Sequence, residues 1–455
     1  MTDDAAEKPR TLVGERVPVR IGLVGCGVVG TGILQLLRDN RRAIEARLGA
    51  PIEVVAIAVR DASKARDEIV PSELVTEDAL SIATHPDVDV VVEVMGGIEV
   101  AGAVVKKALE EGKHVVTANK ALLAEEGDAL LELAEARRVD LYFEAAVAGG
   151  IPILRVLREG LASDRIVALR GIVNGTSNYI LSRMRDAGLG FATALGEAQE
   201  KGYAEADPTL DVNGGDATHK LAILATLAYG ARVHPSQVHT EGIDRVSAVD
   251  MQFAERFGYV IKPLAVARPI GEGADGPRAL DLRVHPALVP ERSVLASIHG
   301  ALNAVFVEGA MLGPCLMSGP GAGAEPTAMS VVSDIVDVGR NMLAGAHSRV
   351  PTRAFHGASL EEIPVQPIEA HRARYYLRFA VEDRAGVLAR IAGVLGGFDV
   401  SIEQMVQTED GDRKATLVML THEAKEGDLR MALEEIARLN YCQEPPAMLR
   451  LEDDA

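Results

Sequence analysis

The chain has 455 residues, of which 48% are hydrophobic and 25% charged, and 66 acidic against 47 basic groups give it a formal net charge of −19. This composition excludes a globally disordered chain, and the acidic excess argues against nucleic-acid or membrane partners, which need basic surfaces. Three separate cysteines, an acidic start without an apolar core, and no apolar run of ~20 residues exclude a disulfide framework, a secretory signal and a membrane span. We therefore expect a cytoplasmic protein of about three domains.

The first 148 residues alternate between strand-like and helix-like segments. The expected strands are 19–24, 51–59, 88–94, 114–117 and 140–144, and the expected helices are 31–48, 100–111 and 124–137. Strands that alternate with helices build parallel sheets through right-handed βαβ units. The sequence therefore predicts an α/β, Rossmann-like domain over residues 1–148.

Two further regions follow, separated by a proline-containing linker over 346–371. Residues 149–345 mix the two patterns, with strands at 166–173 and within 294–307 and helices over 217–229 and about 326–343, so we expect an α+β domain. In residues 372–455 the expected strands are 374–381, 400–407, 414–421 and 447–451, and the expected helices are 386–396 and 426–439. The order βαββαβ is typical of a ferredoxin-like domain.

A Gly-x-Gly-x-x-Gly turn joins the first strand to the first helix. Gly25 permits the turn, Gly27 lets the backbone approach a pyrophosphate, and Gly30 allows close packing of helix on strand. The amides of Val28 and Val29 then open a helix N-terminus, where phosphate binds. A purely structural glycine turn is the alternative, but the position inside a βαβ unit favours a dinucleotide.

The end of the second strand bears on the choice of dinucleotide. Arg60 and Lys64 are suited to a 2′-phosphate and favour NADP, whereas Asp61 is suited to a free ribose 2′-hydroxyl and keeps NAD open. A solvated loop of mixed charge is the alternative to both.

Three charged residues stand out as candidate catalytic groups. Lys120 follows a strand of the first domain, where the carboxyl ends of a parallel sheet face the ligand. Asp216 and Lys220 are one helical turn apart and share a face, and the apolar residues after Lys220 suggest a buried ammonium that could act as a general acid. The alternatives are a surface lysine and an ordinary ion pair.

The motifs GCGVVG, TANK, FEAAVAGGIPIL, GIVNGTSNYIL and GYAEADPTLDVNGGDATHK together resemble homoserine dehydrogenase over about residues 19–345. From about residue 372 the chain resembles an ACT domain, notably at 381–388, although Ala385 stands where that pattern often has proline. The resemblance implies NAD(P)H-dependent, reversible reduction of L-aspartate 4-semialdehyde to L-homoserine, on the route to threonine and methionine. It also implies a catalytic and dimerisation domain over 149–345, whose segment 319–345 returns to the cofactor domain.

The same resemblance assigns roles to individual residues. Lys220 would donate the proton, Asp216 would position the substrate or that lysine, and Lys120 would lie between nicotinamide and substrate. The remaining residues would bind substrate (Glu205, Asn174, Gly175, Thr176), contact the cofactor (Gly321, Gly323) or hold Na⁺ or another monovalent cation (Glu144, Val147, Gly149, Ile151). For Glu144, a strand-end carboxylate without a metal is the alternative.

The resemblance further implies inhibition by L-threonine through the ACT domain, and a homodimer or homotetramer. Another dehydrogenase of amino-acid semialdehydes is one rival, but its oxidative form needs a nucleophilic cysteine, and Cys26, Cys315 and Cys442 lack the setting for one. A non-enzymatic amino-acid sensor is the other rival, against which the retention of Lys220 and Asp216 argues.

Overall fold

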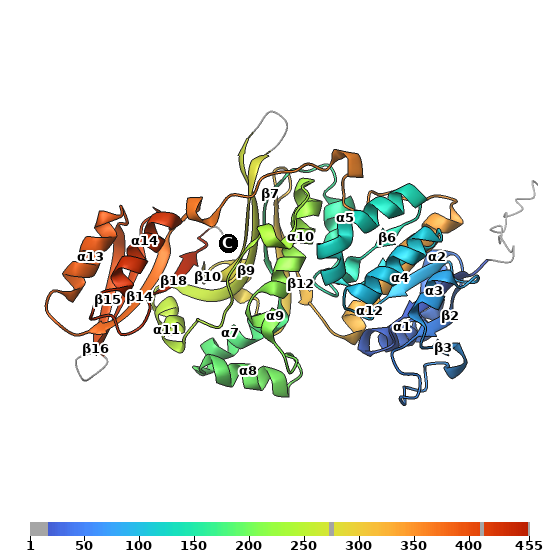
Figure 1. The fold of residues 1–455 in the computed structure, drawn as a ribbon, viewed down its shortest axis with the longest axis horizontal. Helices are drawn as coiled ribbons and strands as arrows, with labels where there is room; N and C mark the ends of the chain where they lie inside the picture. The colour runs from blue at the N-terminus through green and yellow to red at the C-terminus, as the bar shows by residue number, and fades with distance from the viewer. Residues whose placement is uncertain (1–16, 273–276, 410–413, 454–455) are drawn as a thin grey trace, which may run out of the picture.

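The computed structural model describes residues 17–272, 277–409 and 414–453. Three bodies lie in a row along the long axis of the molecule, from the parallel sheet at the blue end to the small red domain (Figure 1). The expected fold class, a Rossmann-like sheet followed by an α+β domain and a ferredoxin-like domain, is confirmed. Within the described ranges, no helix has both the length and the apolar character that a membrane crossing requires.

The first sheet has six parallel strands in the order β3-β2-β1-β4-β5-β6. The strands are β1 (Val19–Val24), β2 (Ile52–Ala58), β3 (Val75–Thr76), β4 (Val90–Glu93), β5 (His114–Thr117) and β6 (Leu141–Tyr142). The helices are α1 (Val28–Asp39), α2 (Arg41–Leu48), α3 (Ala79–Thr84), α4 (Glu99–Glu110) and α5 (Lys120–Arg137). The strand order reverses beside β1, and sheets of this kind bind ligands at the carboxyl ends of the strands at that point.

Both faces of this sheet are buried because successive strand residues point to opposite sides. Ile21 and Leu23 of β1 enter one core, while Val24 enters the other. The second core also holds Val104 of α4 and Leu122 of α5, so these two helices cover that face. Both faces of the sheet are thus covered, and the loops at the carboxyl ends of its strands remain for ligand binding.

Helix α12 (Ala324–Leu343) comes from the second domain and packs against α1. Its Val331 and Ile335 are fully buried in the same core as Ile21. Gly32 of α1 permits the contact, since a Cβ there would lie only 3.0 Å from the carbonyl oxygen of Ala324. One core of the first sheet is therefore completed by a helix that lies far along the chain.

The second domain is built on a mixed sheet, which runs β12-β11-β7-β9-β10 with β8 beside β10. Its strands are β7 (Ile166–Ile172), β8 (His239–Thr240), β9 (Tyr259–Glu272), β10 (Pro277–Pro290), β11 (Leu302–Gly309) and β12 (Gly313–Pro320). Its helices before α12 are α6 (Ile153–Arg155), α7 (Gly175–Ala187), α8 (Phe191–Glu200), α9 (Thr209–Val212), α10 (Gly215–Tyr229) and α11 (Ala248–Arg256). Figure 1 shows α10 against this sheet and next to α5 of the first domain.

The third domain continues the same sheet instead of standing apart from it. Its strand order is β18-β14-β16-β15, and β18 pairs in parallel with β10. The elements are β13 (Arg372–Ala373), β14 (Tyr375–Glu382), α13 (Val387–Gly397), β15 (Ile402–Glu409), β16 (Lys414–Thr421), β17 (Ala424–Lys425), α14 (Glu426–Ala437) and β18 (Ala447–Leu451). Hydrogen bonds along β10 and β18 therefore join the small domain to the middle one.

The structure differs from the sequence-based expectation at several element boundaries. The expected helix over 31–48 is two helices that meet at Asn40, and α5 begins at Lys120 instead of 124. The long hairpin of β9 and β10 was not anticipated, because prolines such as Pro263 and Pro286, which face each other in it, argue against strand structure.

Candidate active site

The glycine-rich turn after β1 leaves the start of α1 open. Gly25 has a φ of +101°, and a Cβ there would lie 2.7 Å from the backbone nitrogen of Met95. A Cβ at Gly30 would lie 2.4 Å from the carbonyl oxygen of Gly25, whereas a Cβ at Gly27 would meet nothing within 4 Å. Gly27 is also the N-cap of α1 and has no side chain to cap it. The amides of the first turn, those of Val28 and Val29 included, lie beside open space at Gly27, as phosphate binding at a helix N-terminus needs.

The loop after β2 folds on itself and leaves two cations exposed. Asp61 accepts hydrogen bonds from the backbone and hydroxyl of Ser63, and Arg66 donates to the carbonyl oxygens of Ala62 and Lys64. The hydrogen bonds from Ser63 lower the pKa of Asp61. The side chains of Arg60 and Lys64 form no ion pair with any residue that the structure describes. Both are thus available to a phosphate, whereas Asp61 is engaged within its own loop.

A buried carboxyl at the end of β4 organises the loops around this crevice. Glu93 accepts a hydrogen bond from the hydroxyl of Thr117 at 2.5 Å and from the amides of Met95 and Gly96. Burial raises the pKa of Glu93, and these hydrogen bonds oppose that shift. Sequence analysis did not single out Glu93, although an acidic residue that ends an apolar strand is a recognisable signal.

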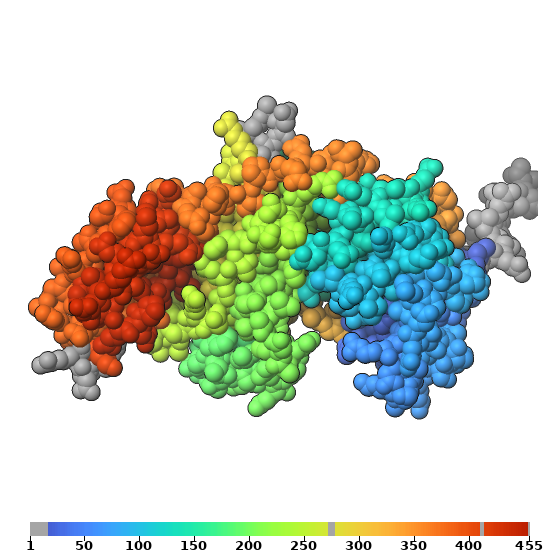
Figure 2. All heavy atoms as spheres, in the orientation of Figure 1, coloured from blue at the N-terminus to red at the C-terminus, as the bar shows by residue number. Residues whose placement is uncertain are grey.

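Asn119 fixes the position of Lys120. Its side-chain oxygen caps α5 by accepting from the amide of Leu122, and its side-chain nitrogen donates to the carbonyl oxygen of Gly97. Lys120 consequently begins α5 at the carboxyl end of β5 and extends toward the second domain. Figure 2 shows a notch between the first domain, in blue, and the green helices of the second.

Two lysines converge on one buried carboxylate. Lys220 Nζ lies 2.7 Å from Asp216 Oδ2, and Lys120 Nζ lies 3.1 Å from Asp216 Oδ1. Burial alone would raise the pKa of Asp216, but the two ammonium groups hold it below its usual range. Asp216 in turn raises the pKa of Lys120. The expected trio of catalytic candidates is therefore brought together in three dimensions.

The ammonium of Lys220 uses two of its three N–H donors. Its ammonium donates to the carbonyl oxygen of Val173 at 2.6 Å and to Asp216 at 2.7 Å, and only 8% of the residue is exposed. An ammonium carries three donors, so one N–H remains without a partner among the described residues. A carbonyl oxygen of a substrate is a suitable acceptor for it.

The polar wall beside this trio contains Asn174, Thr176 and Asp211. Asn174 donates to Asp216 at 2.8 Å and to Asp211 at 2.7 Å, and its own oxygen caps α7. Thr176 donates to the carbonyl oxygen of Tyr203. Gly175 packs so closely that a Cβ would lie 2.7 Å from the carbonyl oxygen of Ala301. Asp211, whose pKa burial raises, was not proposed from the sequence, although it lies in the same acid-rich motif.

Glu205 lies at the exposed rim of the site. Asp216 is the main cause of the raised pKa of Lys120, and the charges of Asp211 and Glu205 add to it. The carbonyl oxygen of Glu205 accepts a hydrogen bond from Gln199. The exposed carboxylate of Glu205 is thus outside the buried cluster around Asp216.

The residues expected to hold a cation form a buried turn next to α12. The Glu144 carboxylate accepts hydrogen bonds from the amides of Leu154 and Arg155, and burial together with Asp334 raises its pKa to about 7. Ala148 and Gly149 both have positive φ values, 54° and 53°. Gly149 offers its carbonyl oxygen to Ser330, and those of Val147 and Ile151 belong to the same turn.

The glycine-rich turn before α12 meets that same segment. A Cβ at Gly149 would lie 2.4 Å from the carbonyl oxygen of Gly321, and a Cβ at Gly321 would lie 2.0 Å from Asn303. Gly323 has a φ of +120° and is the N-cap of α12. This turn therefore needs glycine for steric reasons alone, whatever else it contacts.

An open phosphate turn on a Rossmann-like sheet, beside two lysines that share a buried aspartate, defines an NAD(P)-binding oxidoreductase. Comparison with known proteins identifies the family. The family model of homoserine dehydrogenase matches residues 152–336, that of the homoserine dehydrogenase NAD-binding domain matches 25–144, and that of the ACT domain matches 375–440. The chain belongs to the homoserine dehydrogenase family, whose reaction in amino-acid biosynthesis reduces L-aspartate 4-semialdehyde reversibly to L-homoserine.

Individual relatives match the chain over nearly its whole length. A homoserine dehydrogenase of Neisseria gonorrhoeae is 46% identical over 436 residues, which cover 96% of this chain and 99% of that protein. The crystal structure of a homoserine dehydrogenase from Thiobacillus denitrificans has 45% identity and a TM-score of 0.90, and the match covers 97% of this chain and 99% of that one. A hyperthermophilic archaeal homoserine dehydrogenase in complex with NADPH has 26% identity and a TM-score of 0.60, over 73% of this chain and 100% of that one.

Proposed function

We propose that Lys220 donates the proton in this reduction, and that Asp216 and Lys120 position the reacting groups. A bound nicotinamide supplies the hydride to the aldehyde carbon. The unused N–H of Lys220 is the observation that carries the assignment, because it leaves one donor for the developing alkoxide. Asp216 keeps the Lys220 ammonium oriented and draws Lys120 to the same point.

The substrate would bind between this cluster and the exposed rim. Glu205 suits the ammonium of an amino-acid substrate because its carboxylate is exposed and of opposite charge. Asn174, Gly175 and Thr176 would line the opposite wall, where the side chain of Asn174 already orients Asp216.

The preferred cofactor would be NADP, with NAD as the alternative. Arg60 and Lys64 are free for a 2′-phosphate, and the archaeal relative is described in complex with NADPH. Gly25, Gly27 and Gly30, with the amides of Val28 and Val29, would hold the pyrophosphate. Lys120, Gly321 and Gly323 would contact the nicotinamide half.

The turn from Glu144 to Ile151 would hold Na⁺ through the carbonyl oxygens of Glu144, Val147, Gly149 and Ile151. Carbonyl oxygens suit hard cations, and each can accept a second interaction. A left-handed alanine costs ~1–2 kcal/mol, and such strain concentrates at functional sites. Exchange of Na⁺ for choline should lower both the unfolding temperature and the rate, and no change in either would remove the ion from the proposal.

We further propose that threonine inhibits the enzyme through the ACT domain. The enzyme would work in the cytosol, since three free cysteines suit a reducing compartment.

The enzyme would be a homodimer or a homotetramer. Strands β12 and β15 are the edge strands of the second sheet among the residues that the structure describes, and exposed Leu316 and Met405 lie on them, as an interface between subunits would need. Light scattering after gel filtration measures the oligomeric state, and a monomer would contradict it.

The reaction is tested by the nicotinamide absorbance on addition of L-aspartate 4-semialdehyde. We expect turnover with NADPH, and slower turnover with NADH. The absence of turnover with both would contradict the proposed roles of all three charged residues.

A further inference from the structure

One face of α5 carries four carboxylates. Glu125, Asp128, Glu132 and Glu135 are three or four residues apart, so they lie on the same side of the helix. Each lies near a basic side chain from outside the first domain: His234 is 3.3 Å and His219 3.8 Å from Glu125, Arg232 is 3.0 Å from Glu132, and Arg353 is 2.6 Å from Asp128 and 3.6 Å from Glu135. Pairs of acidic and basic groups therefore line the contact between the first domain and the rest of the chain.

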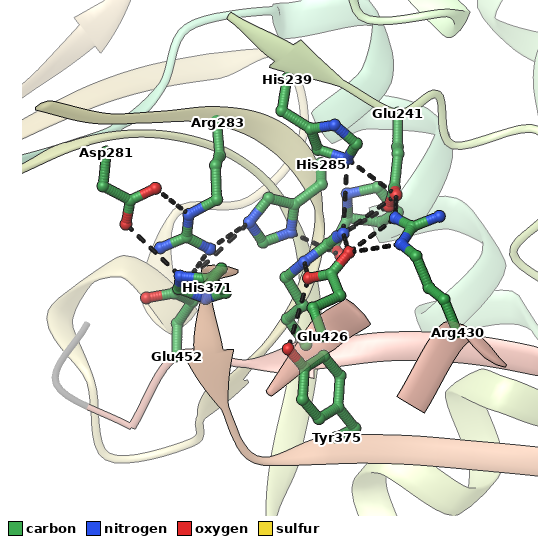
Figure 3. Close-up of polar contacts among 12 residues, drawn as sticks. His239, Glu241, Asp281, Arg283, His285, His371, Tyr375, Glu426, Arg430 and Glu452 are labelled. Carbon is green, nitrogen blue, oxygen red and sulfur yellow. Dashed lines mark hydrogen bonds and ion pairs between the residues drawn. The ribbon is translucent and has the colours of Figure 1, made fainter. Parts of the chain in front are cut away.

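Figure 3 shows a second set of paired charges, between the middle domain and the ACT domain. Arg283 of β10 donates to Glu452 at 2.7 Å, and Arg430 of α14 donates to Glu241, which follows β8, at 2.8 Å. The two sets share no residue. Each end of the middle domain is thus joined to its neighbour by a separate set of ion pairs.

Arg353 is the buried basic group in the set on α5. Only 2% of it is exposed, whereas Arg232 and His219 are partly exposed and His234 is exposed. Its Nη1 donates to Asp128 at 2.6 Å, and its Nε and Nη2 have no hydrogen-bond partner among the described residues. A buried guanidinium that loses its carboxylate is strongly destabilising, so this ion pair ties α5 to the segment after α12.

The segment that carries Arg353 touches both α5 and α10. On one side, a Cβ at Gly357 would lie 2.5 Å from a carboxylate oxygen of Glu135. On the other side, a Cβ at Gly230, the C-cap of α10, would lie 3.1 Å from the ring of Phe355. The amide of Glu361 also donates to the carbonyl oxygen of Gly230 at 2.9 Å. One stretch of chain therefore spans from the first domain to the end of the catalytic helix.

The space between α5 and α10 is not filled by side chains. A cavity of about 390 Å³ lies there, and Leu123 and Leu131 of α5, Ile223 and Leu227 of α10, and Arg353 all line it. Where close packing is incomplete, apolar contacts alone do not set the distance between two helices. The ion pair of Arg353 with α5 is directional and supplies that constraint.

The separation of these two helices matters to the catalytic cluster. Lys120 begins α5, Asp216 lies in the first turn of α10, and their side chains are 3.1 Å apart. Asp128 is about two turns beyond Lys120 on the same helix. A shift of α5 at Asp128 would therefore also move Lys120 relative to Asp216.

We propose that Arg353 is a positioning residue for the reduction: through Asp128 it holds α5 at the distance from α10 at which Lys120 meets Asp216. This assignment rests on the roles proposed above for Lys120 and Asp216. Arg353 itself touches neither residue, so its effect on the rate passes through the helix.

The first test removes the guanidinium and keeps its apolar stem. We expect Arg353→Met to lower kcat per NADPH-binding chain at least 10-fold, since a misplacement of ~1 Å can cost ~10²-fold. Fluorescence titration with NADPH counts the folded chains, and its Kd should change less than threefold because the phosphate turn is elsewhere. Arg353→Lys keeps a cation for the single bond to Asp128 and should return kcat to within threefold of wild type.

The matched control is Arg283→Met. Arg283 is 1% exposed and belongs to the set in Figure 3, so its loss disturbs a buried ion pair outside the contact of α5 with α10. Its kcat per NADPH-binding chain should stay within threefold of wild type. A kcat of Arg353→Met within threefold of wild type, or the same loss in Arg283→Met, would overturn the assignment.

The second test addresses the partner. The Asp128 side chain is 52% exposed, so Asp128→Asn should fold, and we expect it to lower kcat at least fivefold. Because both residues act through one ion pair, Arg353→Met combined with Asp128→Asn should be no more than twofold slower than Arg353→Met alone. A wild-type kcat in Asp128→Asn, or a double variant that shows the product of the two losses, would contradict the pairing.

A third variant separates this assignment from the function on which it rests. Lys120→Met should lose at least 10-fold in kcat. If it does and Arg353→Met keeps its rate, the positioning role alone is wrong. If Lys120→Met turns over as fast as wild type, the proposed role of Lys120 is wrong, and the positioning role falls with it.

Discussion

The ammonium of Lys120, at the start of α5, lies 3.1 Å from Oδ1 of Asp216 on α10, so one ion pair connects the cofactor domain to the catalytic helix. Asp216 is 7% exposed and also holds Lys220. A single carboxylate therefore sets the distance between two lysines that come from different domains. A motion that separates Lys120 from α10 would therefore also remove one of the two ammonium partners of Asp216.

Replacement of Lys220 should remove the proton donor while preserving the fold. Lys220→Met keeps the apolar stem, so we expect kcat to fall about 10²–10⁴-fold, as for the loss of a general acid. Cofactor affinity, measured by fluorescence titration with NADPH, should change less than threefold. Lys106→Ala, at an exposed position of α4, is the control, and a Lys220→Met rate within 10-fold of wild type would contradict the role.

Replacement of Asp216 should move the pH profile in a defined direction. Because Asp216 raises the pKa of Lys120, its carboxylate keeps that ammonium protonated to higher pH. In Asp216→Asn this support is lost, so the alkaline limb of kcat/KM should shift to lower pH. Rates measured from pH 6 to 11 give the shift, with Asp87→Asn on the surface of the first domain as control. An unmoved limb would show that Lys120 does not limit activity at high pH.

The preference for NADPH should depend on two exposed cations. A charge-assisted hydrogen bond contributes about 1.5–3 kcal/mol, which corresponds to roughly 10–100-fold in affinity. Arg60→Ala and Lys64→Ala should therefore each raise the KM for NADPH by that factor and leave the KM for NADH within threefold. Arg42→Ala on α2 should change neither constant. A parallel loss for both cofactors would mean that these residues do not contact a 2′-phosphate.

Glu452 should matter to stability because it balances buried cations. It accepts hydrogen bonds from Arg283 at 2.7 Å and Arg268 at 2.6 Å, and it is 4% exposed. Loss of one partner from a buried pair costs about 3–5 kcal/mol. We expect Glu452→Gln to lower the free energy of unfolding in urea by that amount at pH 7, whereas Glu434→Gln, in an exposed pair, should have little effect.

The ion pairs of Glu452 also predict how its contribution to the free energy of unfolding depends on pH. Burial alone would raise the pKa of Glu452, but Arg283 and Arg268 hold it below its usual range. A lowered pKa means that the contribution is complete above about pH 4.3, the unfolded value, and is lost as the pH falls further. The difference between wild type and Glu452→Gln should therefore be constant from pH 5 to 8 and shrink below pH 4. A difference that grows on acidification would contradict this sign.

Much of the fold followed from the sequence because its signals are local. The strands at 114–117, 414–421 and 447–451 have the bounds that alternation and turn residues predicted. The glycine turn at Gly25 could be recognised because a positive φ and close packing admit no other residue. Resemblance to a family then supplied the roles of residues that spacing alone left open.

Only the tertiary structure brought the distant residues together. Asn174 and Asp211 meet Asp216 through the packing of α7 and α9 on α10, and no periodicity in the sequence encodes that contact. The parallel pairing of β18 with β10 and the hydrogen bonds from Arg450 to Glu241 likewise depend on which edges of separate domains meet. The sequence determined the local elements and the family, because turns and periodicity act over a few residues. The tertiary structure decided the two sets of ion pairs and the cavity beside α5, because burial and pairing of charges depend on neighbours from other parts of the chain.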